Sequence, residues 1–199
     1  SRPFIIPEFD ADTQALLARN PYNVEFGERV AFAAASRSLH GLTADRMEFI
    51  GRLGSMRRPA ALWRVGLDRR FLPGLDPCAA LQVHVDLEAG ETQEVWFVLG
   101  QGRDREEALD LVRRYRDADV AREAFASTVD LWNGLLARVT VDAPDTALNV
   151  LLNRWLLYQN LSSRIWGRSA FYQSSGAYGF RDQLQDVMAL VHARPEEAR

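Results

Sequence analysis

The chain is poor in cysteine, in net charge and in long apolar runs, and each shortage excludes a class of protein. Its 199 residues include one cysteine, Cys78, which has no partner for a disulfide within the chain and fits a reducing compartment better than a secreted one. The formal charge is −3, from 24 basic and 27 acidic residues interleaved along the chain, so no basic surface for nucleic acid is indicated. We therefore expect a cytoplasmic protein without a nucleic-acid partner.

No stretch reaches the roughly 18 consecutive apolar residues that a membrane-spanning helix needs, and the N-terminus lacks the order of a signal peptide. Any membrane attachment would come from sequence outside this stretch. The chain opens with "SRPFIIPEFD", without a start methionine, and stops at "VHARPEEAR" just after a periodic apolar segment. These two ends predict that the chain is a fragment of a longer protein.

The residues up to about Gln101 are predicted to be mostly β. The segment "LQVHVDLEAGETQEVWFVLG" alternates apolar and polar residues before and after a turn at Ala89-Gly90, which predicts a hairpin or two adjacent antiparallel strands. The alternating apolar residues are Leu81, Val83, Val85 and Leu87, then Val95, Phe97 and Leu99. Upstream, "YNVEFGERVAFAAAS" and "DRMEFIGRLGS" are short runs that favour strands broken by glycine.

From Gly102 onward the pattern becomes helical. Asp104 and Glu107 form a capping-box pattern ahead of an apolar series that begins at Ala108. A second apolar set at 131–136 predicts another helix, and "VTVDAPDT" separates it from a third, for which Asp145 is the expected N-cap. The expected buried stripe of this third helix is Leu148, Leu151, Leu152 and Trp155.

A loop rich in glycine and aromatic residues, "GRSAFYQSSGAYGF", follows the third helix. Glycine allows close backbone approach, and aromatic faces offer a flat apolar surface on which the C–H groups of a pyranose stack. This composition suits a sugar. The alternative is that the aromatic residues cover the edge of a core beside a flexible loop.

The next helix, which is expected to begin near Arg181, separates polar from apolar residues. Asp182, Gln185 and Asp186 stand at i, i+3 and i+4 on one face, opposite an apolar face at 184, 187, 188 and 191. An ordinary solvated stripe is the alternative interpretation. A binding role is favoured because like charges at i, i+4 repel each other and because this face lies at the mouth of the loop. Carboxylates and a guanidinium hold hydroxyl groups well, since each hydrogen bond to an ionised group contributes roughly 1.5–3 kcal/mol.

Other candidate sites are weaker. The three histidines, His40, His84 and His192, share no metal-ligand spacing, so no metal site is expected. The segment "GQGRD" has too few glycines for a dinucleotide fingerprint, and no G-x-S-x-G is present. Cys78 has no histidine nearby in the sequence and is interpreted as a packed small apolar residue. No cofactor is predicted.

Three segments resemble glycoside hydrolase family 94, and within it the glycoside phosphorylase region of cyclic β-1,2-glucan synthases. "RWLLYQNLSSRIWGRSAFYQSSGAYGFRDQLQDVMAL" is similar to the start of that family's catalytic domain. "MEFIGRLGSMRRPAAL" and "GLDPCAALQVHVDLEAGETQEVWFVLGQG" are similar to the last part of its preceding β-sandwich. The resemblance covers most of residues 46–192, and its "GFRDQLQD" motif is more specific than its β-part.

The resemblance implies an α+β multidomain fragment. It would contain the C-terminal part of an antiparallel, carbohydrate-binding-like β-sandwich at 1–101, a helical linker at 102–143, and the first helices of an (α/α)6 barrel at 144–199. Residues that match the family's glucosyl-binding motif are Arg181, Asp182 and Asp186, with Gln185 and Tyr172 as weaker candidates. They are expected to hold hydroxyl groups of the donor sugar.

The resemblance also implies a reaction, inverting phosphorolysis, with inorganic phosphate as co-substrate. Phosphate attacks the anomeric carbon while one carboxylic acid protonates the leaving oxygen. That acid is expected beyond Arg199, so no catalytic residue is assigned to this chain; an alternative in which Asp182 or Asp186 is the acid is less favoured. A six-hairpin barrel needs about twelve helices, whereas the chain after Asp145 has room for roughly two. The chain alone is therefore expected to be inactive.

The function expected from the resemblance is that of a piece of a cyclic β-1,2-glucan synthase or a related β-glucan phosphorylase. The alternative is a noncatalytic carbohydrate-binding or scaffolding module. The expected partners are a β-glucan oligosaccharide and the rest of the parent polypeptide, with a homodimer left open. The parent protein is expected to be anchored in the bacterial inner membrane, with this soluble part in the cytoplasm.

Overall fold

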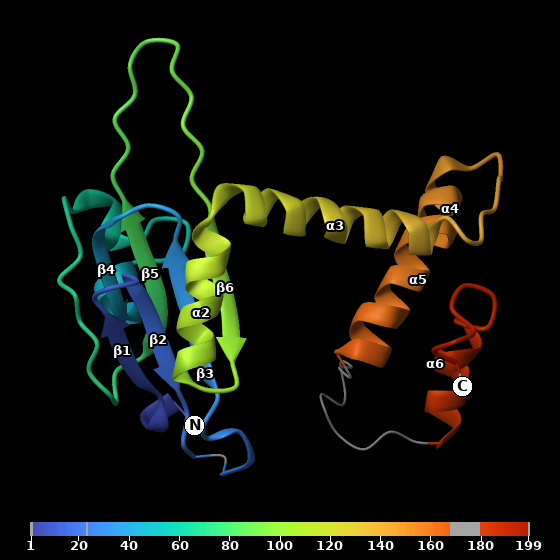
Figure 1. Ribbon diagram of the computed structural model, residues 1–199, viewed down its shortest axis with the longest axis horizontal. Coiled ribbons are helices and arrows are strands. Elements are labelled where there is room, and N and C mark those ends of the chain that lie inside the picture. Colours follow the sequence, from blue (N-terminus) through green and yellow to red (C-terminus); the bar gives the residue numbers. More distant parts are fainter. Residues whose placement is uncertain (1, 23, 168–179, 199) are drawn as a thin grey trace. The chain divides into compact units, whose positions relative to one another are not determined.

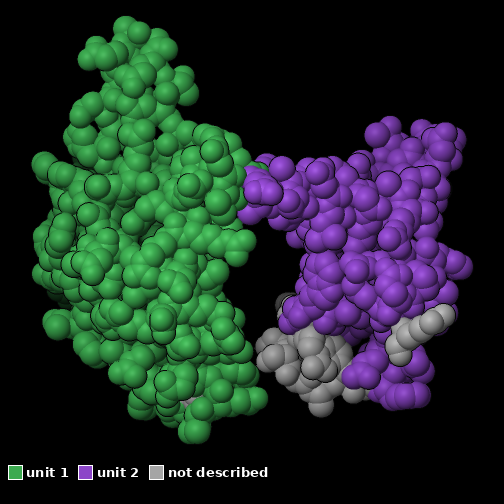
Figure 2. Space-filling view, viewed as in Figure 1, with its two compact units in different colours: residues 1–122 green, residues 123–199 purple. Residues whose placement is uncertain are grey.

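The computed structural model describes residues 2–22, 24–167 and 180–198, which form two compact units, Ser1–Arg122 and Glu123–Arg199 (Figure 2). The division falls within helix α3 (Ala118–Leu136). All the strands belong to the first unit, and the second is helical among its described residues. Within the described part of the chain, no helix combines the length and the apolar character needed to cross a membrane.

A four-stranded antiparallel sheet forms one layer of the first unit (Figure 1). Its strands, in spatial order, are β1 (Ile6–Asp10), β2 (Ala15–Arg19), β3 (Val30–Ala35) and β6 (Phe97–Gly102). Phe32 of β3 lies directly opposite Gly100 of β6. A Cβ atom at position 100 would lie 2.6 Å from the Phe32 ring, so glycine is needed there to let the ring cross the strand.

A two-stranded sheet of β4 (Leu39–Asp45) and β5 (Pro77–Val83) forms a second layer. An apolar cluster joins the two sheets, with Leu16 and Ala35 from the larger sheet and Leu39 and Leu42 from the smaller one. The predicted antiparallel β-rich first half is therefore confirmed as two packed sheets. Short 3-10 turns precede β1, as η1 (Arg2–Phe4), and lie in the connections between later elements, as η2 (Val24–Phe26) and η3 (Ala60–Trp63).

The predicted hairpin at residues 81–99 is wrong. β5 ends at Val83 and pairs with β4, whereas β6 pairs with β3 in the other sheet. Residues 84–96 form a long connection that projects beyond the sheets (Figure 1), with the expected turn at Ala89-Gly90. Alternation identifies a half-buried strand but carries no information about its partner. The strand-like run "DRMEFI" is also wrong, because Arg46–Ile50 is helix α1, capped by the Asp45 side chain.

Helix α2 (Arg105–Arg116) covers the other face of the four-stranded sheet (Figure 1). Asp104 accepts a hydrogen bond from the Glu107 backbone N–H, while the Glu107 carboxylate accepts one from the Arg103 N–H. The N-cap of the predicted capping box is confirmed. The Glu107 side chain bonds the backbone N–H of Arg103, one residue before the N-cap residue Asp104, whose N–H it would bond in a standard capping box. Leu109 and Val112 then pack against the sheet in a second apolar cluster.

The second unit contains one continuous helical segment at 146–166 and a shorter helix after it. The segment consists of α4 (Thr146–Val150), the π-helical turn η4 (Leu151–Trp155), α5 (Leu156–Gln159) and a second π-helical turn η5 (Asn160–Trp166). Asp145 caps it by accepting a hydrogen bond from the Ala147 N–H, as predicted. Helix α6 (Phe180–Met188) is the last element.

The predicted buried stripe of the 146–166 segment is wrong. Leu148, Leu151, Leu152 and Trp155 are 40%, 41%, 37% and 52% exposed. The core of this unit instead contains Leu161 with Leu135 and Leu136 of α3 and Leu190 after α6. Each π-helical turn adds a residue to the helical repeat, so a stripe counted at 3.6 residues per turn does not stay on the buried side.

Candidate functional site

Helix α6 brings the predicted acidic residues to one face, but it places them in different surroundings. Arg181 is 84% exposed and lies 3.7 Å from the Asp182 carboxylate, which is itself 37% exposed. Gln185 is exposed. Asp186 is directed into the unit, with a side chain only 18% exposed. Tyr172, the fifth candidate, lies outside the described residues.

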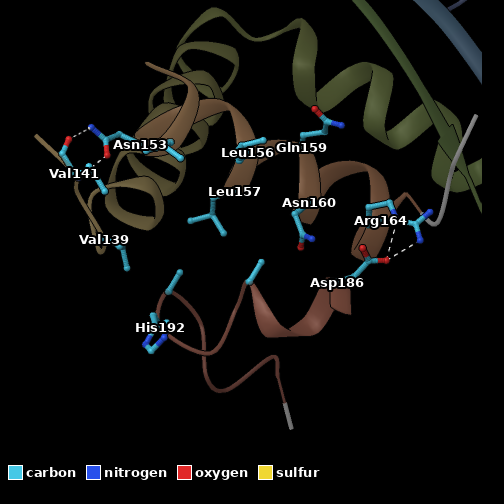
Figure 3. Close-up of a pocket in the computed structure, with 13 residues that line it drawn as sticks. Val139, Val141, Asn153, Leu156, Leu157, Gln159, Asn160, Arg164, Asp186 and His192 are labelled. Atoms are coloured by element: carbon cyan, nitrogen blue, oxygen red, sulfur yellow. Dashed lines mark hydrogen bonds and ion pairs between the residues drawn. The ribbon is translucent and has the colours of Figure 1, made fainter. Parts of the chain in front are cut away.

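Asp186 meets an arginine that the sequence analysis did not select. Its Oδ2 accepts a hydrogen bond from Nε of Arg164 at 2.8 Å, and the Arg164 Nη2 lies 2.8 Å from the same oxygen in an ion pair (Figure 3). Arg164 belongs to η5 and is also 18% exposed. The only local signal for it was its helical spacing of four residues from Asn160, which places the two side chains on one face.

A pocket of about 510 Å³ opens beside this ion pair, within the second unit (Figure 3). Asn160, Arg164 and Asp186 line one side of it, and Leu156, Leu157 and Val139 supply apolar wall. His192 also contributes to the lining. Pockets that combine apolar wall with a few convergent polar groups are typical of small-molecule sites.

Two asparagines in this lining have different roles. The Asn153 amide is satisfied twice by the backbone of Val141, since its Oδ1 accepts from the Val141 N–H at 2.7 Å and its Nδ2 donates to the Val141 carbonyl at 2.8 Å. Asn160 has a buried Oδ1 that finds no hydrogen-bond partner among the described residues. A buried acceptor without a donor costs about 1–3 kcal/mol, so Asn160 calls for a donor from a ligand or from water.

The site can therefore bind a molecule that donates hydrogen bonds. Of the predicted residues, Asp186 lines the pocket, while Arg181, Asp182 and Gln185 share α6 with it without lining this pocket. Sequence reasoning missed Arg164 and Asn160, because the face of the 146–166 segment that meets α6 depends on contacts between residues far apart in the sequence. Among the described residues, no group of histidine, cysteine and acidic side chains could hold a metal ion.

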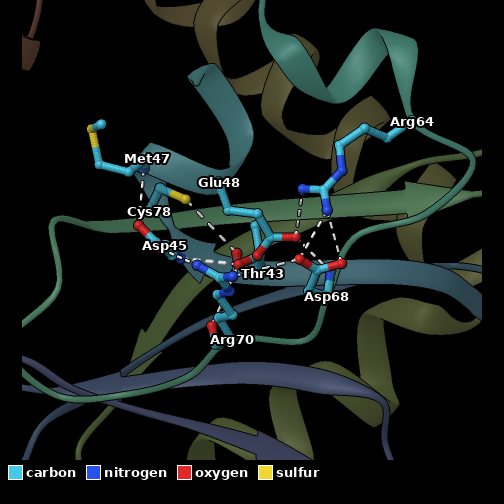
Figure 4. Close-up of polar contacts among 8 residues, drawn as sticks. All are labelled: Thr43, Asp45, Met47, Glu48, Arg64, Asp68, Arg70 and Cys78. Carbon is cyan, nitrogen blue, oxygen red and sulfur yellow. Dashed lines mark hydrogen bonds and ion pairs between the residues drawn. The ribbon is translucent and has the colours of Figure 1, made fainter. Parts of the chain in front are cut away.

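A second polar cluster lies in the first unit around Glu48, whose side chain is 1% exposed (Figure 4). Its Oε1 accepts hydrogen bonds from Nη1 of Arg64 and from the Asp68 backbone N–H. Arg64 also pairs with the Asp68 carboxylate at 2.8 Å, and Arg70 lies 3.5 Å from Asp45. The two arginines thus offset most of the charge of the three acids, and the cluster links residues 64–70 to α1 and β4. We interpret it as structural.

Cys78 lies beside this cluster and has the properties of a packed thiol. Burial, followed by the negative charges of Asp45 and Asp76, raises the pKa of the Cys78 thiol to about 11. Its Sγ donates a weak hydrogen bond to the Thr43 carbonyl at 3.7 Å. Since the thiolate is the nucleophilic form, this environment suppresses reactivity.

Comparison with known proteins gives the chain its family. The supersandwich domain of glycosyl hydrolase 94 matches residues 1–118, and the catalytic domain of the glycosyl hydrolase 94 superfamily matches residues 131–199. The chain is 39% identical, over 99% of its length and 7% of the relative, to the cyclic beta-(1,2)-glucan synthase NdvB of Rhizobium meliloti.

Two phosphorylases are also similar to the chain. The N,N'-diacetylchitobiose phosphorylase of Vibrio furnissii is 30% identical over 89% of the chain and 22% of the relative. The 3-O-beta-D-glucopyranosyl-beta-D-glucuronide phosphorylase of Paenibacillus borealis is 26% identical over 96% of the chain and 25% of the relative. The chain thus spans a quarter or less of each of these three relatives. It belongs to glycosyl hydrolase family 94, with a supersandwich-domain region followed by a catalytic-domain region.

Proposed function

We propose that this chain is part of a cyclic β-1,2-glucan synthase or a related β-glucan phosphorylase, in which it supplies the donor-glucose-binding motif for phosphorolysis of β-1,2-glucan. The observation that carries the proposal is the 39% identity to a cyclic beta-(1,2)-glucan synthase over 99% of the chain. The phosphorylases among the relatives support the reaction type, since their names describe action on linked sugars.

The proposed chemistry is inverting phosphorolysis. A phosphate oxygen attacks the anomeric carbon of the terminal glucose, the glycosidic bond breaks, and a carboxylic acid gives its proton to the departing oxygen. The products are glucose 1-phosphate and a glucan shortened by one residue. Phosphate takes the place of the activated water of an inverting hydrolase, so one catalytic carboxylate suffices.

This chain contributes binding groups to that reaction and not the acid. Arg181, Asp182 and Asp186, with Gln185 and Tyr172 as weaker candidates, hold hydroxyl groups of the donor glucose. The proton donor is supplied by sequence beyond Arg199. The same proposal includes a three-part organisation with boundaries after residues 101 and 143. It also includes a parent protein anchored in the membrane, with this part in the cytoplasm, and the remainder of the polypeptide as the partner.

A noncatalytic carbohydrate-binding module is the second candidate, and one observation in the first unit favours it. The rings of Phe4 and Tyr22 stack with centroids 4.6 Å apart, and the two residues are 46% and 64% exposed. Exposed aromatic faces are suited to contact with a pyranose.

The test uses the longest natural protein that contains this chain. With β-1,2-glucan and inorganic phosphate it should release glucose 1-phosphate, which a coupled enzymatic assay measures. Arg181→Ala and Asp186→Asn should each lower the rate by about a hundredfold or more, because loss of a positioning contact misplaces the reacting carbon. Near-normal turnover in both variants would remove them from the donor site, and absence of release from the parent protein would favour the binding module.

The chain by itself should bind β-1,2-glucooligosaccharides only weakly. A titration followed by tryptophan fluorescence measures this, since Trp132, Trp155 and Trp166 all lie in the helical second unit. Micromolar affinity would contradict the proposal that the donor site needs the rest of the polypeptide.

A further inference from the structure

The Asp186 carboxylate is held at one of its oxygens. Both contacts from Arg164 converge on Oδ2, and Oδ1 makes no hydrogen bond with a described residue. The charge of Arg164 is balanced by this pairing. A carboxylate whose rotation is fixed in this way presents its second oxygen in a defined direction.

A second acceptor faces the same pocket from the helical segment. Asn160 lies four residues before Arg164, so it shares a helical face with it, and its buried Oδ1 has no partner among the described residues. In Figure 3 the Asn160 and Asp186 side chains project into the space between the 146–166 segment and α6. The pocket is therefore lined by two side chains, each with an acceptor oxygen that has no partner among the described residues, and that of Asn160 is buried.

We propose that Arg164 is a positioning residue which orients Asp186, and that Asp186 Oδ1 and Asn160 Oδ1 together accept hydrogen bonds from hydroxyl groups of one sugar ring. This inference rests on the proposed function, because it completes the donor-glucose site from the 146–166 segment. Hydroxyl groups of a sugar can donate to both oxygens, whereas a phosphate dianion has one O–H donor and a double negative charge that the Asp186 carboxylate repels. Leu156 and Leu157, in the same lining, are suited to contact the C–H groups of the ring. The pocket is thus specific for the sugar and not for phosphate.

The experiment compares the kinetics toward β-1,2-glucan with those toward phosphate in the longest natural protein that contains this chain. In Arg164→Met and in Asn160→Leu, kcat/KM for β-1,2-glucan should fall about tenfold or more, while KM for phosphate should change less than about twofold. Arg164→Lys should recover part of the loss, because a lysine keeps the charge but not the two-point contact. Arg154→Met is the matched control, since Arg154 lies on the same segment and its exposed side chain donates a hydrogen bond to Asn133, away from the pocket lining.

Two kinetic results would overturn the inference. A rise in KM for phosphate in Arg164→Met would make Arg164 an anion-binding residue. If glucan kinetics are unchanged in Arg164→Met and Asn160→Leu while Asp186→Asn is inactive, Asp186 binds the sugar without positioning by Arg164 and without a second acceptor from Asn160. If Arg164→Met fails to fold, Asn160→Leu decides alone, because it removes no charge.

A direct binding measurement separates this inference from the proposed function. A β-1,2-linked glucose disaccharide is titrated calorimetrically into the same proteins. If the parent releases no glucose 1-phosphate but binds the disaccharide, and Arg164→Met and Asn160→Leu weaken binding about tenfold, the proposed reaction fails and the sugar site stands. If the parent is active and the two variants bind as it does, the sugar site fails and the reaction stands.

Discussion

Arg164 and Asp186 lie 22 residues apart in the sequence and are joined by two 2.8 Å contacts to one carboxylate oxygen. The pair links the helical segment at 146–166 to α6, which carries the proposed glucosyl-binding residues. It also explains why an acid on α6 faces inward while Leu184 and Met188 on the same helix are 51% and 68% exposed. The charge of Arg164 compensates for the partial removal of Asp186 from water.

A double-mutant cycle on Arg164→Met and Asp186→Asn should give a coupling free energy of about 1–2 kcal/mol. The reason is that a partly buried ion pair with a hydrogen bond interacts more strongly than an ion pair on the surface. Urea unfolding of the chain measures it. The exposed pair Arg122 and Asp119, at 62% and 96% side-chain exposure, is the control and should give less than about 0.5 kcal/mol. Equal couplings in both cycles would show that burial adds nothing to the Arg164 contact.

The buried Glu48 carboxylate should be important for the stability of the first unit. Glu48→Gln replaces a charged acceptor of the Arg64 and Asp68 hydrogen bonds by a neutral amide, so the free energy of unfolding should fall by about 1–3 kcal/mol. Thermal and urea unfolding measure the change. Glu88→Gln, at an exposed position, should change stability by less than about 0.5 kcal/mol. A loss no larger than that of Glu88→Gln would contradict the role given to the cluster.

Asp10 should make stability depend on pH in the acid range. Burial alone would raise the pKa of this carboxyl, but hydrogen bonds from Thr13 and the Arg105 guanidinium outweigh burial and hold the pKa below its ordinary value of 3.8. A lowered pKa in the folded state stabilises the protein above the unfolded value, and this contribution is lost as pH falls below about 4 through the folded value.

Melting temperatures of the wild type and of Asp10→Asn, measured from pH 6 to pH 2, test this dependence. The stability difference between the two proteins should be constant above about pH 5 and should shrink below about pH 4. A difference that stays constant to pH 2 would show that Asp10 contributes no linked protonation.

The Cys78 thiol should be unreactive while the chain is folded. Its pKa of about 11, against an ordinary value of 9.0, implies roughly a hundredfold smaller thiolate fraction at pH 8. Iodoacetamide should therefore alkylate the native chain at least tens of times more slowly than the urea-unfolded chain, as followed by mass spectrometry. Equal rates in the two states would show that the thiol is not protected by burial.

Local sequence determined the features that depend on neighbouring residues. The capping residues Asp104 and Asp145 start their helices as predicted, and the spacing of Asp182 and Asp186 places them on one face of α6. A cap or a helical face involves residues within about one turn, so the chain itself carries the needed information. The family motif at 179–186 was equally local, and it led to the family that the comparisons show.

Tertiary structure alone decided the pairing of distant segments. β5 pairs with β4 and not with β6, Leu148 and Trp155 are exposed although their spacing predicted burial, and Arg164 pairs with Asp186. Each outcome depends on which surfaces meet after the chain folds back, where burial and charge compensation outweigh local preference. The sequence by itself therefore determined where helices α2 and α4 begin and that α6 has an acidic face. The fold decided that Asp186 of this face is turned inward, because Arg164 balances its charge there.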